Sequence, residues 1–213
     1  MTQAVTLVTG GTREWRAGAT TEPERAAERQ IVVDARADPQ AFAPLYRAYV
    51  GPIYRYHHAH VRAVQDAEDL TAATFGAALA SLGRYREQDQ FSAWLFTIAR
   101  HVLIDFRRRQ RRLGALTAPQ PTDTAGDETP LGTLADSGLT PEGCAVQADE
   151  ASRLHRLLAA LPRDQREAVT LRYFGDLRPA EIGVVLERGD GAVRTLLHRA
   201  LDRLRRAYRE EER

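Results

Sequence analysis

The sequence has a single cysteine, Cys144, no lysine and no long hydrophobic run. One cysteine excludes an internal disulfide, and it excludes a zinc site built from several cysteines of this chain. No stretch approaches the roughly 20 apolar residues that a membrane-spanning helix needs. Residues 1–16 also lack the basic patch and apolar run of a secretory signal. We therefore expect a folded, cytoplasmic protein.

Because lysine is absent, all 30 basic residues are arginine, and with 29 acidic residues the net charge is +1. Exclusive use of arginine also accompanies a GC-rich genome, so arginine content alone does not indicate nucleic-acid binding. The distribution of the arginines along the chain is more informative than their number.

The chain of 213 residues is long enough for two small domains. Residues 1–37 show no sustained apolar period, which predicts a flexible amino-terminal extension with room for one short helix near residues 23–35. Residues 113–150 contain four prolines and seven acidic residues but no basic residue, a composition that predicts a flexible acidic linker.

Apolar residues recur at helical spacing in the two remaining segments, residues 38–112 and 151–213. Neither segment shows an alternating strand pattern of useful length. The sequence therefore predicts an all-α protein with two small helical domains joined by the linker.

The carboxy-terminal segment predicts a helix-turn-helix. Pro179 suits the first turn of a helix that ends at Leu186, and Gly189 and Gly191 break the chain before a second helix that reaches Tyr208. In a helix-turn-helix the front of the second helix enters the major groove of DNA. The exposed candidates there are Arg194, Thr195, His198 and Arg199. An ordinary helical hairpin with a solvated arginine face is the alternative.

The amino-terminal segment ends in a basic helix. Five arginines lie among the six residues 107–112, a cluster that suits phosphate binding but also favours a helix carboxy terminus through its dipole. Before this helix, Arg84, Tyr85 and Arg86 could hold and stack an unpaired strand. We expect Trp94 to lie in the core.

Two further clusters are candidate sites. Asp66, Glu68 and Asp69 precede a helix, where they favour its dipole and could engage a basic partner. His57, His58 and His60 lack the spacing of a metal site, so we expect surface histidines, no metal and no cofactor. A small hydrolase that uses these histidines would need a nucleophile and a base, and no credible pair accompanies them.

Several short motifs in this order resemble the sigma factors of bacterial RNA polymerase, specifically the short extracytoplasmic-function (ECF) group with domains two and four only. In the first domain they are Ala67 to Leu70 with Thr74 and Phe75, Phe91 to Leu95, Ile98 to Arg100, and Asp105 with the arginine run. In the second they are Leu161 and Pro162, Gln165 to Glu167, Leu171 and Arg172, Ala180 to Ile182, and Val193 with His198 to Ala200. One departure is Glu187, which stands where the family usually has a turn glycine.

The resemblance implies a non-catalytic initiation subunit that binds the RNA polymerase core and promoter DNA. Residues 38–112 would be sigma domain two and residues 151–213 sigma domain four. Polymerase docking would use Asp66, Glu68, Asp69 and Thr74. The proximal promoter element and DNA melting would use Arg84, Tyr85, Arg86, Arg100, His101, Arg107, Arg108, Arg111 and Arg112. The upstream element would be held by Arg194, Thr195, His198 and Arg199. The family also implies an anti-sigma factor as a partner and no small-molecule substrate.

A stand-alone helix-turn-helix regulator is the rival hypothesis for function. It would bind DNA without polymerase, and it leaves the pattern from Trp94 to Arg112 unexplained.

Overall fold

The computed structural model describes residues 22–61, 63–86, 91–116 and 152–211, and these residues form helices and connecting turns without a strand. Within this part of the chain, no helix is long and apolar enough to cross a membrane. The predicted all-α class with two helical bundles is confirmed. Most of the predicted acidic linker, residues 117–150, lies outside the described residues.

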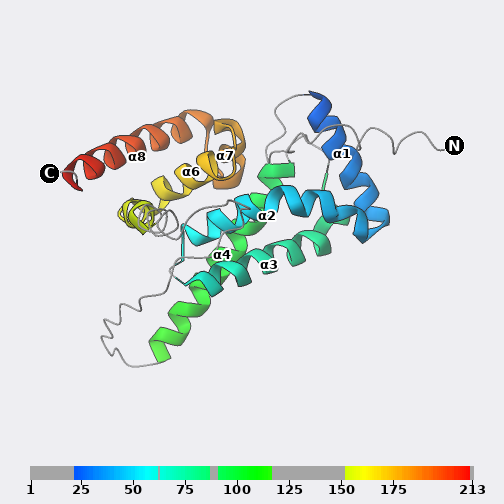
Figure 1. The fold of residues 1–213 in the computed structure, drawn as a ribbon, viewed down its shortest axis with the longest axis horizontal. Coiled ribbons are helices and arrows are strands. Elements are labelled where there is room, and N and C mark those ends of the chain that lie inside the picture. Colours follow the sequence, from blue (N-terminus) through cyan, green and yellow to red (C-terminus); the bar gives the residue numbers. More distant parts are fainter. Residues whose placement is uncertain (1–21, 62, 87–90, 117–151, 212–213) are drawn as a thin grey trace, which may run out of the picture.

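The amino-terminal bundle consists of α1 (Glu22–Ala37), α2 (Ala43–His58), α3 (Val64–Ser81) and α4 (Phe91–Leu116), with short 3-10 turns at Pro39–Phe42 and Leu82–Arg84. Helices α2, α3 and α4 pack side by side (Figure 1). The helical spacing of apolar residues places one stripe of each helix inward. Fully buried side chains include Tyr49, Ile53, Leu95, Phe96 and Leu103.

Helix α1 matches the short helix that was expected near residues 23–35, but its packing corrects the expectation that residues 22–37 belong to a flexible extension. Residues 22–37 form a helix, and its Val32 and Ala35 are buried in the bundle core. The buried Glu28 accepts a hydrogen bond of 2.6 Å from the Tyr49 hydroxyl. The sequence signal was weak because only a narrow stripe of this helix is apolar, while the rest of its surface is charged.

The carboxy-terminal bundle consists of a helical segment at residues 152–159, then α6 (Arg163–Tyr173), α7 (Pro179–Leu186) and α8 (Asp190–Glu211). The Glu181 side chain accepts a hydrogen bond of 2.7 Å from the Arg178 backbone N–H and so caps α7. Glu187 ends α7 in the left-handed conformation, with φ of 55°. The predicted helix-turn-helix is therefore formed by α7 and α8, although its turn uses Glu187 in a conformation that glycine adopts more easily.

The two bundles pack directly against each other, with α7 on α4 (Figure 1). Gly175, two residues after the end of α6, lies so close to Phe96 that a Cβ atom there would stand 2.8 Å from the Phe96 Cζ. Leu177, Ile182, Val185 and Leu186 of the carboxy-terminal bundle belong to the same hydrophobic cluster as the core of the amino-terminal bundle. The face of α4 that carries Phe96 is therefore covered by the carboxy-terminal bundle.

Candidate nucleic-acid interface

The front of α8 presents the predicted upstream-element residues on one exposed surface. The Arg194 and His198 side chains are 71% and 77% exposed. Each contacts a carboxylate of its own helix: Arg194 forms an ion pair with Asp190 at 2.7 Å, and His198 Nε2 lies 3.2 Å from Asp202 Oδ2. Because exposed ion pairs contribute little free energy, these side chains can exchange their partners for DNA. Thr195 and Arg199 are also exposed.

The carboxy-terminal part of α4 forms a second basic surface. Asp105, Arg108, Arg109 and Arg112 line an open pocket of about 290 Å³. Arg108 lies 3.5 Å from Asp105, and both side chains are well exposed. His101 and Arg111 are exposed on the same helix. This basic surface of α4 can therefore accept phosphate groups without any rearrangement of the helix.

Arg100 and Arg107 lie on another side of α4 and face the carboxy-terminal bundle. Arg100 Nε lies 2.9 Å from Glu167 Oε1 of α6, an ion pair by distance rather than an aligned hydrogen bond. Arg107 donates a hydrogen bond of 3.4 Å to the His60 carbonyl. Burial, and next the positive charge of Arg163, lower the pKa of Arg107. These two predicted DNA-contacting residues are thus separated from the exposed basic surface.

The predicted melting segment, residues 84–86, is only partly exposed. Arg84 and Arg86 are exposed, but Tyr85 is 9% exposed and packs against Phe91 and Trp94, with ring centroids 5.8 Å and 4.9 Å away. Trp94 is half-buried in this aromatic cluster. Arg84 and Arg86 are therefore accessible to a DNA strand, whereas the Tyr85 side chain is packed in the aromatic cluster.

The predicted polymerase-docking residues are likewise partly exposed and partly buried. Glu68 and Asp69 are exposed on the first turns of α3, and Asp66 is half-buried. Thr74 is fully buried, and its hydroxyl donates to the Leu70 carbonyl at 2.7 Å. A buried threonine cannot contact a partner, so we leave Thr74 out of the proposed docking surface.

The expectation that His57, His58 and His60 lie on the surface is wrong for His57. Its side chain is fully buried, and its Nε2 lies 2.9 Å from Thr74 Oγ1. Because the Thr74 proton is donated to Leu70, His57 Nε2 must be the donor, and its neutral Nδ1 is left without a partner. Burial lowers the pKa of His57 to about 3. Among the described residues, no group of three His, Cys, Asp or Glu side chains could hold a metal ion.

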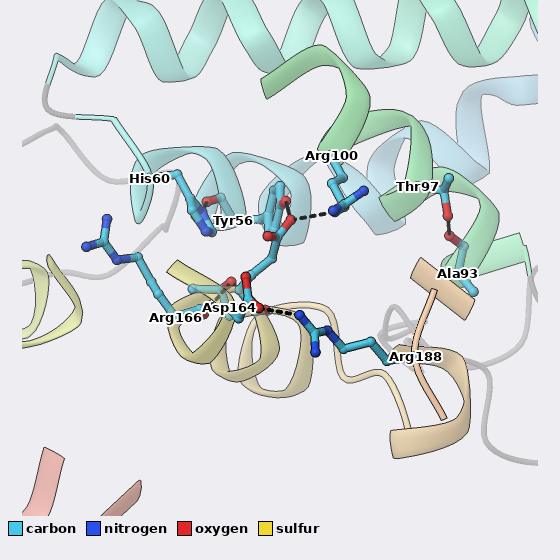
Figure 2. Close-up of polar contacts among 10 residues, drawn as sticks. Tyr56, His60, Ala93, Thr97, Arg100, Asp164, Arg166 and Arg188 are labelled. Atoms are coloured by element: carbon cyan, nitrogen blue, oxygen red, sulfur yellow. Dashed lines mark hydrogen bonds and ion pairs between the residues drawn. The ribbon is translucent and has the colours of Figure 1, made fainter. Parts of the chain in front are cut away.

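Glu167 of α6 lies at the contact between the two bundles, toward which Arg100 and Tyr56 point in Figure 2, and the sequence predicted no role for it. It is 3% exposed, and its Oε1 accepts from the Tyr56 hydroxyl at 3.3 Å in addition to facing Arg100. Burial, and next the charge of Glu167, raise the pKa of Tyr56 well above its usual value. The sequence showed a family motif at residues 165–167 but no sign that its carboxylate faces the other domain.

Comparison with known proteins agrees with this arrangement. Residues 45–113 match the family model of sigma-70 region 2, and residues 151–204 match that of sigma-70 region 4. The ECF RNA polymerase sigma factor BldN of Streptomyces coelicolor is 34% identical over 195 residues, which cover 90% of this chain and 70% of BldN. The ECF sigma factor SigW of Bacillus subtilis is 28% identical, over 88% of this chain and 99% of SigW.

Among solved structures, CnrH in complex with the cytosolic domain of CnrY has the same fold, with a TM-score of 0.63 at 21% identity over 86% of this chain and 98% of CnrH. The two helical bundles and the two matched regions define a sigma-70-type transcription factor. The chain belongs to the ECF group of RNA polymerase sigma factors.

Proposed function

We propose that this sigma factor directs RNA polymerase to promoters by reading two DNA elements with separate helices, and that it has no catalytic activity of its own. Residues 38–112 act as domain two and residues 151–213 as domain four, and residues 113–150 link them. The basic surface of α4 binds the proximal element, and the front of α8 binds the upstream element. The observation that carries this proposal is the exposure of both surfaces, since Arg108 and Arg194 are at least 65% exposed.

Each proposed surface has a distinct chemical role. Arg194, Thr195, His198 and Arg199 lie at the front of the second helix of a helix-turn-helix, where side chains reach base edges in the major groove. Arg108, Arg111 and Arg112 supply cationic contacts to phosphate, which position the protein without reading sequence, and His101 supplies a hydrogen-bonding ring on the same helix.

DNA opening and polymerase docking use the remaining exposed residues. Arg84 and Arg86 flank the packed Tyr85 and can hold the backbone of a separated strand. Asp66, Glu68 and Asp69 form an acidic patch at the start of α3 that suits a basic surface of the polymerase core.

We further propose that an anti-sigma protein inhibits this chain and that the chain acts in the cytoplasm. In solved structures, CnrH is in complex with the cytosolic domain of CnrY, and the sigma factor RpoE of Bartonella quintana is in complex with the anti-sigma factor NepR. RNA polymerase and the bacterial chromosome, which are the proposed partners, are both cytoplasmic.

The salt dependence of promoter binding tests the basic surface of α4. For holoenzyme reconstituted with purified core polymerase, log K falls linearly with log salt concentration, and each phosphate contact contributes a slope of about 0.9. Arg111→Ala should weaken binding to every promoter fragment and reduce the slope by about one unit.

Arg47→Ala is the matched control, because Arg47 is an exposed arginine of α2 away from this surface. Both variants lose one positive charge, but the control should keep the wild-type slope. An Arg111→Ala holoenzyme with the wild-type slope would show that Arg111 is only a solvated side chain.

A further inference from the structure

Helix α1 is tied to the segment that carries Arg84 and Arg86. Arg36, in the last turn of α1, donates a hydrogen bond from its Nη2 to the Tyr85 carbonyl, which lies 49 residues further along the chain. Helix α1 also lies against the 3-10 turn that precedes Tyr85. It comes before residues 45–113, which match the sigma-70 region 2 model. The contact is therefore a feature of this chain that the matched region does not include.

The Tyr85 side chain is held separately from its carbonyl. Its ring packs against the ring of Phe91, with centroids 5.8 Å apart. The Phe91 ring in turn lies 5.5 Å from the ring of Tyr49, whose hydroxyl donates to Glu28 of α1. Tyr85 is thus held at two points, its ring by the aromatic cluster and its carbonyl by Arg36, and α1 contributes to both.

The hydrogen bond from Arg36 determines the direction in which the chain continues. The Tyr85 carbonyl belongs to the planar peptide unit that joins Tyr85 to Arg86, so a fixed carbonyl fixes this plane. A hydrogen bond with a charged donor is also stronger than one between neutral groups. On the other side, the Tyr85 N–H donates to the Leu82 carbonyl at 3.1 Å. Arg84 and Arg86 therefore start from defined backbone positions, while their side chains remain exposed.

We propose that Arg36 is a positioning residue for promoter opening, which holds the backbone between Arg84 and Arg86 in the conformation that receives the separated DNA strand. The proposal rests on the proposed function, in which these two arginines hold that strand. A segment that is ordered before it meets the strand loses less conformational entropy on binding. Arg36 acts on opening through Tyr85 and not by contacting DNA.

Opening of a promoter in duplex and pre-opened form tests the role of Arg36. Holoenzyme is reconstituted from core polymerase and the full-length chain, and the probe is a promoter fragment from a start site of the wild-type protein. Arg36→Ala should slow opening of the duplex by about tenfold, measured by the permanganate reactivity of unpaired thymines. On the same fragment with a mismatched stretch at the start site, transcription should stay within about twofold of wild type, because the strands are already separated.

Two further variants distinguish the hydrogen bond from the charge. Arg36→Lys keeps a charged N–H donor and should restore opening to within about threefold of wild type. Arg47→Ala is the matched control, because Arg47 is an exposed arginine of the neighbouring α2, and it should open the duplex at the wild-type rate. The salt dependence of binding by Arg36→Ala should equal that of wild type, since loss of a phosphate contact would reduce the slope by about one unit.

A wild-type rate of opening in Arg36→Ala would overturn the proposal, and so would an equal loss on the duplex and the pre-opened fragment. A reduced salt slope would also overturn it, because Arg36 would then be a direct phosphate contact. Circular dichroism verifies that Arg36→Ala folds. If it does not, Arg36→Met, which keeps the apolar length of the side chain without the donor, should show the same loss of opening.

A double variant with Arg84→Ala and Arg86→Ala tests the proposed function separately. Wild-type opening by the double variant would show that this segment has no part in melting, so the proposed function of the segment would fail together with the role of Arg36. A defect in the double variant combined with wild-type opening by Arg36→Ala would overturn the positioning role alone.

Discussion

At the residue scale, the buried His57 makes stability depend on pH. Its pKa falls from the usual 6.5 to about 3 in the folded protein because burial disfavours the charged ring. Between these values the unfolded chain binds a proton that the folded chain does not, so stability rises with pH and is lost as pH falls below 6.5. His60 contributes in the same direction, with a pKa lowered to about 3, first by burial.

We therefore expect the free energy of unfolding in urea to fall by roughly 1 kcal/mol for each of these histidines between pH 7.5 and pH 5.5. His57→Gln, whose amide can still donate to Thr74, should remove the His57 part of this change. A free energy of unfolding that is independent of pH over this range would contradict the neutral, buried assignment.

The burial of His57 could not be predicted from the sequence. The spacing of the histidines predicts no metal site, but it could not show that His57 points into the core. Its only signal is helical register, because His57 follows Tyr49 and Ile53 at intervals of four residues on the buried stripe of α2. His57 was predicted to be exposed because histidine is polar, although its position lies on the apolar stripe of α2.

At the scale of elements, α1 is an integral part of the amino-terminal bundle rather than an appendage. Val32→Ala should lower the free energy of unfolding by about 2 kcal/mol, because Val32 is fully buried and its methyl groups would leave a cavity. Val33→Ala on the same helix is the control, since Val33 is 43% exposed and should change stability by less than about 0.5 kcal/mol. Equal effects of the two substitutions in urea denaturation would show that α1 does not pack as described.

The helix-turn-helix was predictable from the sequence because nearby residues determine where its two helices begin and end. Pro179 fixes the start of α7, and the glycines around Asp190 separate α7 from α8, so the predicted helices agree with the observed ones within a few residues. The last turn of α4 was not predictable in this way. Gly114 follows the arginine run, yet α4 continues to Leu116.

At the scale of the whole molecule, the sequence predicted two domains but not their contact. Periodicity identifies which face of a helix is apolar, but not whether that face meets its own bundle or another one. Arg100 of α4 was therefore assigned to DNA, and Phe96 was given no role. The positions of Gly175 and Glu167 against these residues appear only when the chain is folded.

The most direct test of the account is to map the transcripts that this sigma factor starts. The purified chain is combined with sigma-free core polymerase from a GC-rich bacterium and genomic DNA from its source, and the transcript ends are sequenced. We predict discrete new start sites that share two spaced upstream elements, and Arg194→Ala should change preference at the upstream element only. Absence of core binding and of new starts, with the protein folded and free of inhibitor, would contradict the account.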